Sequence, residues 1–374
     1  MNGFEQAFGH GLTAWAGVAL GFTSVTLWRL RRAPAGAPVV APEWPPVLLL
    51  RPMDAPTPRE LSNLASPVDY PGELEQVVVS PYRPRLPAGV AWLPSDPTRR
   101  NRKAGHLAYA LSALEVKGRV VLSVDADVAV DGALVKGLVA PLRSGAALST
   151  AAPAVDGARG MAGRAVRSLL CHGHHSFLAL HAMSAGAQAV CGKALGLSEV
   201  AQRILPELAD HIGEDLELSK ALHARGERVA LSAACARVPA APVRTSAALD
   251  RFTRWMQVLR AHRPGLYPTV PLLFAPAWPL AFCALVHGGA LPSAAVLAFL
   301  GSRVLLGLRL GALHGVREGA ATDWLMAEAL LLSSWVHSLF RRTVSWRGRV
   351  FNVLPGGRMV PDTSGAGLGG GAQP

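Results

Sequence analysis

The chain has 374 residues, of which half are hydrophobic and only 17% are charged, whereas a typical soluble protein carries about 25% charged residues. This deficit argues against a fully water-soluble protein and indicates a membrane protein. The formal net charge of +12 suits anionic lipid headgroups or phosphate-bearing substrates. Nucleic acid is not expected as a partner, because the Lys and Arg residues are scattered along the chain.

The N-terminal segment has the pattern of a membrane-spanning helix. Residues 6–28 contain no Asp, Glu, Lys or Arg, and Arg29, Arg31 and Arg32 follow at once. One crossing needs about 20 apolar residues, and flanking positive charges favour the cytoplasmic side. We therefore expect a transmembrane helix over residues 6–28 with the N-terminus outside. A buried core helix is the alternative.

Short apolar runs alternate with helical patterns between residues 45 and 263. This alternation predicts an α/β fold with a mostly parallel sheet. Ligands of such sheets bind beyond the carboxyl ends of the strands. We expect residues 45–263 to form a cytoplasmic domain with this architecture. Its predicted strands are residues 47–50, 76–80, 90–93 and 119–124, and its first predicted helices are residues 59–65 and 102–116.

Two carboxylates, Asp125 and Asp127, follow the fourth predicted strand. They share one side of the chain, because side chains alternate along an extended segment. Hard oxygen ligands suit Mg²⁺ or Mn²⁺, and such an ion can bridge a nucleotide diphosphate and neutralise the charge that builds on it. An Asp-x-Asp sequence alone is weak evidence, because acidic turns after strands are common.

A second acidic pair, Glu214-Asp215, follows Gly213 and opens a predicted helix that ends near residue 223. Acidic side chains stabilise the first turn of any helix, so a structural role is one interpretation. The functional interpretation is that one carboxylate removes the proton from an acceptor hydroxyl.

A third motif, Arg251-x-x-Arg254-Trp255, places two arginines on neighbouring turns of a predicted helix. Arginine can clamp phosphate with two hydrogen bonds. The indole of Trp255 can stack on an acceptor or lie at a membrane interface. A basic helix that binds lipid headgroups is the alternative.

The C-terminal third is again apolar. No charged residue occurs from residue 264 to residue 302, which is long enough for a helical hairpin with its turn at residues 287–292. A third segment, residues 324–340, could span the membrane or lie in its interface. We assign residues 264–342 to C-terminal membrane helices, 343–361 to a membrane-proximal segment and 362–374 to a disordered, glycine-rich tail.

The order of the motifs, Asp-x-Asp, Glu-Asp and Arg-x-x-Arg-Trp, resembles that of family-2 glycosyltransferases. The similarity is greatest to the ceramide glucosyltransferase-like branch, which includes bacterial hopanoid-linked glycosyltransferases, and it covers most of the chain. Further similar segments are residues 47–64, Asn101-Arg102-Lys103, residues 190–194, and the terminal residues 344–349 with Gly356-Gly357.

The resemblance implies a GT-A-like, nucleotide-sugar-binding sheet flanked by transmembrane helices, and an inverting transfer of a hexose from a UDP-sugar to a membrane lipid. The acceptor would be a ceramide, a hopanoid or a diacylglycerol, and the cofactor Mg²⁺ or Mn²⁺. A multi-pass protein of the bacterial inner membrane with a cytoplasmic catalytic domain is expected. The implied residues are Asp215 with Glu214 for catalysis, Asp125 and Asp127 for the metal and donor, Lys103, Arg251 and Arg254 for the diphosphate, and Trp255, His174 and His175 for the acceptor.

One position departs from the family. An Asp usually follows the second strand, where the nucleotide base binds, but this chain has Ser80-Pro81-Tyr82 there. Ser80 itself, Asp54 or Asp96 could replace that carboxylate. A polysaccharide synthase, an inactive membrane scaffold that kept the fold and a non-catalytic, lipid-binding protein are the alternative functions.

Overall fold

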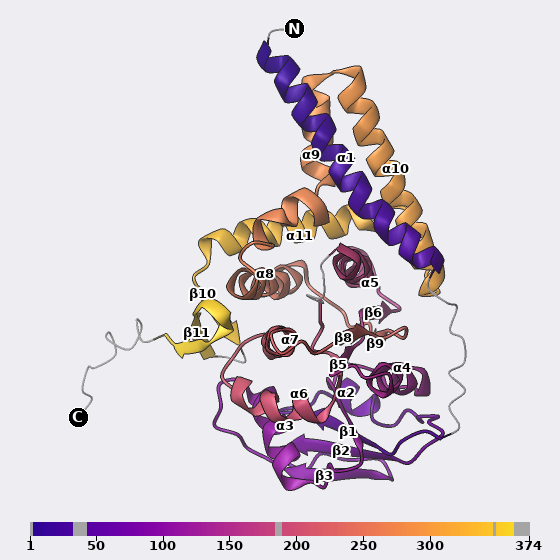
Figure 1. The fold of residues 1–374 in the computed structure, drawn as a ribbon. Coiled ribbons are helices and arrows are strands. Elements are labelled where there is room, and N and C mark those ends of the chain that lie inside the picture. The colour runs from indigo at the N-terminus through magenta and orange to yellow at the C-terminus, as the bar shows by residue number, and fades with distance from the viewer. Residues whose placement is uncertain (1–2, 33–42, 184–188, 347–348, 363–374) are drawn as a thin grey trace, which may run out of the picture.

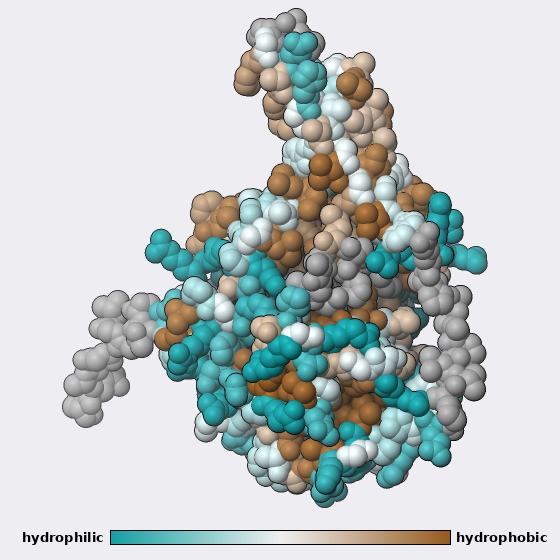
Figure 2. Space-filling view, viewed as in Figure 1, coloured by the Kyte–Doolittle hydropathy of each residue, from teal (hydrophilic) through white to brown (hydrophobic). Residues whose placement is uncertain are grey.

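The computed structural model describes residues 3–32, 43–183, 189–346 and 349–362, except for the side chains of residues 173–178 and 181–182. A part built around a β-sheet carries a bundle of long helices at one end (Figure 1). Hydrophilic residues gather over the sheet-bearing part, whereas the projecting helices present mostly pale and apolar surface (Figure 2). This division follows the composition of the sequence segments from which the two parts are built.

The central sheet has seven strands in the order β3-β2-β1-β4-β7-β5-β8. Strand β7 is antiparallel to both of its neighbours, and every other neighbouring pair in this sheet is parallel. The predicted α/β fold with a mostly parallel sheet is therefore confirmed. The strands are β1 (Val47–Pro52), β2 (Leu74–Ser80), β3 (Val90–Pro94), β4 (Val120–Val124), β5 (Leu148–Thr150), β7 (Ala194–Leu197) and β8 (Val229–Leu231).

Helices cover both faces of this sheet. On one face Leu48 and Leu50 of β1 pack in a core with α3 (Arg102–Ala113), α6 (Glu199–Ile204) and α7 (Glu214–His223). On the other face, Leu49 packs in a core with α4 (Gly132–Arg143). Because strand side chains alternate, one buried apolar run supplies both cores. The short helix α2 (Pro58–Ser62) follows β1.

The projecting bundle consists of α1 (Gly3–Arg32), α9 (Ala277–His287) and α10 (Ala290–Leu313). Two of these helices, α1 and α10, are long and apolar enough to cross a membrane. The segment Tyr267–Phe274 and α9 also pass this test together, but they are bent by 63°, so they could form a broken span or a re-entrant loop. The turn between α9 and α10 lies within the predicted residues 287–292.

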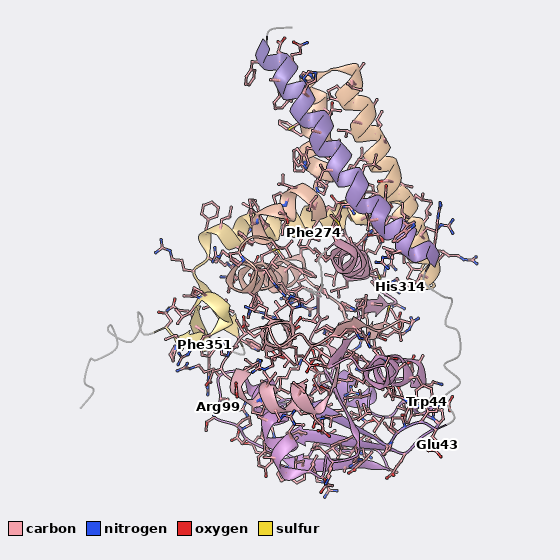
Figure 3. All side chains as sticks on the ribbon, in the orientation of Figure 1. Glu43, Trp44, Arg99, Phe274, His314 and Phe351 are labelled. Carbon is pink, nitrogen blue, oxygen red and sulfur yellow. The ribbon has the colours of Figure 1, made fainter. Side chains whose placement is uncertain are left out.

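Phe22 of α1 and Phe274 meet edge to face, with ring centroids 5.2 Å apart, where the bundle joins the rest of the chain (Figure 3). Beside this junction, α11 (Asp323–Phe340) lies across α5 (Gly160–Met183) and α8 (Thr245–His262) (Figure 1). Helix α11 is not among the described helices that are long and apolar enough to span a membrane by themselves. Its position favours the interfacial interpretation of residues 324–340.

Two small sheets complete the fold. Strands β6 (Pro153–Asp156) and β9 (Ala236–Pro239) form a parallel pair. The segment expected to be membrane-proximal forms an antiparallel sheet of β10 (Thr343–Trp346), β11 (Arg349–Val353) and β12 (Met359–Pro361). Residues 363–374 of the predicted tail lie outside the described residues.

A buried ion-pair network joins α11 to α5. Asp323 is only 3% exposed. It accepts hydrogen bonds from Arg164 at 2.6 Å and from Arg167 at 2.8 Å. Removal of one partner from a buried pair leaves an uncompensated charge in a low dielectric.

We expect Asp323→Asn to lower the free energy of unfolding by about 3 kcal/mol, because Arg167 loses its buried counter-ion. Thermal unfolding of the detergent-solubilised protein measures this change. The control is Asp250→Asn, whose partner Arg341 is 52% exposed and whose loss should cost less than about 1 kcal/mol. Equal destabilisation by the two variants would contradict the importance of the α5–α11 network.

Candidate active site

Lys103 joins three segments at the carboxyl edge of the central sheet. Its Nζ lies 2.8 Å from Asp125 Oδ1, at the end of β4, and 3.2 Å from Glu214 Oε1, at the start of α7. It also donates to the carbonyl of Gly192 at 2.5 Å, just before β7. One ammonium group therefore brings two of the predicted acidic motifs together.

Glu214 is held from both sides. Asn101 caps α3 by accepting from the Ala104 amide, and its side-chain amide donates to Glu214 Oε2 at 2.8 Å and to the carbonyl of His211. With Lys103 on the other oxygen, Glu214 is buried and fully engaged. This geometry suits a positioning group rather than one that contacts a substrate.

The side chain of Asp215 lies beside Glu214 but remains partly accessible. Burial, followed by repulsion from Glu214, raises the pKa of Asp215 to about 7, against the opposing effects of Lys103 and of the Leu216 and Gly192 amides. A Cβ on Gly192 would lie 3.1 Å from Asp215 Oδ2, so glycine permits this close approach. A carboxylate with a pKa near 7 can accept a proton at neutral pH.

The Asp-x-Asp turn is supported from within the fold by Arg51 of β1. The Arg51 guanidinium is fully buried and donates to the carbonyls of Asp125 at 3.1 Å and Val128 at 2.8 Å. Burial opposes ionisation of Asp125, but the neighbouring Lys103 and Lys193 ammonium groups hold the pKa of this carboxyl below its usual value. Asp125 is therefore held as an anion beside two lysines, and Asp127 accepts hydrogen bonds from Lys193 through both of its carboxylate oxygens.

The donor set of this motif is chemically suited to Mg²⁺ or Mn²⁺, because both side chains offer carboxylate oxygens. The side chains of Asp125 and Asp127 are 28% and 37% exposed, so solvent reaches them. Within the described ranges no group of three or more His, Cys, Asp or Glu residues could hold a metal. A divalent ion at this pair would therefore need further oxygen ligands from a phosphate or from water.

The expected place of the nucleotide base is bounded by the ends of β2 and β3. The Ser80 hydroxyl is already used within the fold, since it donates to the Tyr82 carbonyl and accepts from Trp92 Nε1. Asp54 and Asp96 both pair with Arg102, at 2.8 and 2.6 Å. The two carboxylates considered as replacements thus lie on either side of one guanidinium, and Asp96 is the more exposed.

The arginine and tryptophan motif lies on α8. Trp255 packs edge to face on Phe252, with ring centroids 5.1 Å apart, among apolar side chains of α5 and α11. Burial and the neighbouring Arg251 guanidinium lower the pKa of Arg254. In the part of the chain that the structure describes, neither arginine has a carboxylate partner. Unpaired positive charge of this kind attracts an anion.

Helix α8 also touches the acidic motif. Val258, one turn after Arg254, lies so close to Gly213 that an added Cβ there would be 2.8 Å from its Cγ1. The helix that carries the Arg-x-x-Arg-Trp motif therefore packs against Gly213, which directly precedes the Glu-Asp motif. His174 and His175 lie on α5, and their side chains are outside the described set.

The C-terminal sheet fastens the segment that precedes Asp215. The Ile212 amide donates to the Gly357 carbonyl at 2.8 Å. His262 of α8 contacts the Ile212 carbonyl through Nε2 and lies 2.7 Å from Glu217 Oε1 through Nδ1. Gly357 has a positive φ of 80°, and a Cβ there would clash with His262, so only glycine fits.

Several residues of this site were not predicted as functional from the sequence. They share long-range contacts that bring together distant segments. They are Arg51, Lys193, Glu217 and His262. The sequence contained a signal for only two of them. Arg51 is an arginine within an apolar strand, and Lys193 follows Gly192 in a segment that resembles the family.

The raised pKa of Asp215 predicts a stability change with pH. Because the folded protein keeps a proton that the unfolded chain loses near its ordinary pKa, stability falls as pH rises from about 4 to about 7. We expect Asp215→Asn to raise the Tm at pH 8, and to raise it less at pH 6. Glu214→Gln, which weakens the contact with Lys103, should lower the Tm instead. An unchanged Tm for Asp215→Asn at both pH values would contradict the raised pKa.

Comparison with known proteins identifies the family of the chain. The sequence profile of glycosyl transferase family 21 matches residues 84–359. No protein of curated function matches the chain. Among solved structures, the mannosyltransferase PcManGT from Pyrobaculum calidifontis, in complex with GDP-Man and Mn²⁺, is 19% identical and has a TM-score of 0.50, over 90% of this chain and 99% of that chain.

The structural likeness supports the GT-A-like α/β fold, and the profile match covers the segment from before Lys103 to β12. That segment contains the Asp-x-Asp, Glu-Asp and Arg-x-x-Arg-Trp motifs. The chain is a glycosyltransferase that belongs to glycosyl transferase family 21, the ceramide glucosyltransferase-like family.

Proposed function

We propose that this enzyme transfers a hexose from a UDP-sugar to the hydroxyl of a membrane lipid, such as a ceramide, a hopanoid or a diacylglycerol, with inversion at the anomeric carbon. The observation that carries this proposal is the partly accessible Asp215, with a pKa of about 7, beside the Lys103 and Asp125 pair. A proton acceptor and a diphosphate-binding pair within one site match the needs of such a transfer.

The donor would bind at the carboxyl edge of the sheet. Asp125 and Asp127 would hold Mg²⁺ or Mn²⁺, which when bound would neutralise charge on the leaving diphosphate. The mannosyltransferase with GDP-Man and Mn²⁺ supports a nucleotide sugar and a divalent ion. Arg251 and Arg254 have no carboxylate partner among the described residues, which leaves their charge available to the diphosphate.

Asp215 is the proposed base. Its carboxylate would accept the proton of the lipid hydroxyl as the oxygen attacks the anomeric carbon from the side opposite the diphosphate. This single displacement would turn an α-linked donor into a β-linked product. Glu214 and Asn101 would position Asp215 without touching the substrate, which agrees with the engagement of both Glu214 oxygens.

The acceptor would reach the site from the membrane. Trp255 lies among apolar side chains between α5 and α11, close to the projecting bundle, and would line the path of the lipid. His174 and His175 of α5 are proposed acceptor contacts. The enzyme would lie in a bacterial inner membrane through residues 6–28 and helices of residues 264–342, with the domain of residues 45–263 in the cytoplasm.

The uracil base would lie near the ends of β2 and β3. Ser80 is hydrogen-bonded within the fold, so the exposed Asp96 is the better replacement for the carboxylate that the family usually has there. With Asp96 in this role, the enzyme would bind the base although it has Ser80 where the family usually has an Asp.

The activity is tested with purified enzyme, Mg²⁺ or Mn²⁺, a panel of UDP-sugars and a ceramide or hopanoid acceptor, with UDP release as the measurement. We expect release that depends on one lipid, and a loss of about 10²–10⁴-fold in kcat for Asp215→Asn, the range for removal of a general base. The matched control, Asp69→Asn, changes an exposed carboxylate and should keep full activity. Normal turnover by Asp215→Asn would reject its role as the base.

The same assay separates the alternatives. Release without a lipid, together with a growing polymer, would identify a polysaccharide synthase. Absence of both release and nucleotide binding would identify a scaffold that kept the fold.

The pH dependence of kcat/KM provides a further prediction. Because the base must be ionised, the rate should fall about tenfold for each pH unit below the pKa of about 7 and level off above it. Initial rates between pH 5 and pH 9 measure this profile. A flat profile across pH 7 would contradict Asp215 as the rate-determining base.

A further inference from the structure

Lys193 makes contacts at the Asp-x-Asp motif that the proposed reaction does not explain. Its Nζ donates to both oxygens of Asp127, at 2.8 and 2.6 Å, and lies 4.0 Å from Asp125 Oδ2. The ammonium therefore lies where a divalent ion shared by the two carboxylates would have to bind. The Lys193 side chain is only 14% exposed, so this ion pair is largely shielded from solvent.

The backbone around Lys193 fixes its place. The Asp125 amide donates to the Lys193 carbonyl at 2.8 Å, directly before β7 pairs with β4. The preceding Gly192 carbonyl accepts from Lys103. Because this backbone is anchored on both sides, only the long side chain can leave the carboxylates without disturbing the sheet.

The charges at the site are balanced when Lys193 is in place. Asp125, Asp127 and Glu214 contribute three negative charges, and Lys103, Lys193 and the buried Arg51 contribute three positive ones. A divalent ion added alone would leave an excess of positive charge between two ammonium groups. An ion that arrives with a diphosphate brings the negative charge that compensates it.

We infer that Lys193 competes with the divalent ion for Asp125 and Asp127, so that the ion binds tightly only together with the nucleoside diphosphate. On binding of the nucleoside diphosphate, Lys193 would leave Asp127 and its ammonium would pair with the diphosphate. Lys193 would thus disfavour binding of the ion alone and favour its binding together with the nucleoside diphosphate. This inference rests on the proposed function only in placing the ion at Asp125 and Asp127.

The test measures Mn²⁺ binding by electron paramagnetic resonance, without any sugar transfer. In the absence of nucleotide, Lys193→Met should bind Mn²⁺ at least tenfold more tightly than the unaltered enzyme. Addition of UDP should tighten binding strongly in the unaltered enzyme and much less in the variant. The matched control, Lys117→Met, alters an exposed lysine before β4 and should bind as the unaltered enzyme does.

Two further variants secure the result. Lys193→Gln, which keeps a polar side chain but removes the positive charge, replaces Lys193→Met if circular dichroism shows that the latter does not fold, and the same tightening is expected. Adding Asp127→Asn to either variant should abolish the gain. Equal Mn²⁺ affinity of the folded Lys193 variants and the unaltered enzyme would overturn the competition by Lys193 but not the proposed metal site. Absence of Mn²⁺ binding in all proteins, with and without UDP, would also overturn the proposed metal site.

Discussion

The shared ammonium of Lys103 is the contact on which the site depends. It touches Asp125 at the end of β4, Glu214 at the start of α7 and the Gly192 carbonyl before β7. The carboxylates of Asp125 and of the buried Glu214 would repel each other without it, and loss of one partner from a buried ion pair costs several kcal/mol. The positions of the proposed metal pair and of the proposed base follow from this one side chain and from the helix α3 that presents it.

The raised pKa of Asp215 opposes the stability of the fold to the proposed role of this residue as a base. Glu214 is engaged by Asn101 and Lys103, whereas Asp215 beside it accepts from the Leu216 and Gly192 amides. The same burial and repulsion that weaken the folded state above pH 7 keep this carboxylate basic enough to accept a proton. Lys193 makes a similar trade-off, because its ammonium stabilises the acidic pair that is proposed to bind the ion.

The sequence predicted the features that rest on local patterns. Buried apolar runs predicted β1, β2 and β4, and the acidic residues after β4 and before α7 were recognised as site candidates. The reversed strand β7 was not predicted, because Ala194–Leu197 is short and carries no signal of direction. The roles of Arg51 and Lys193 were also missed, since they depend on contacts with residues more than sixty positions away. Such contacts are set by packing rather than by periodicity.

The contact between Gly357 and Ile212 has a consequence for how the enzyme matures. The helix that carries Asp215 is synthesised before α9, α10 and α11, but the carbonyl that accepts from the Ile212 amide belongs to a residue made after them. A nascent chain therefore holds every acidic group of the site while the segment before Asp215 is still unfastened. The geometry of the candidate site is completed only after these helices have been synthesised and the C-terminal sheet has docked.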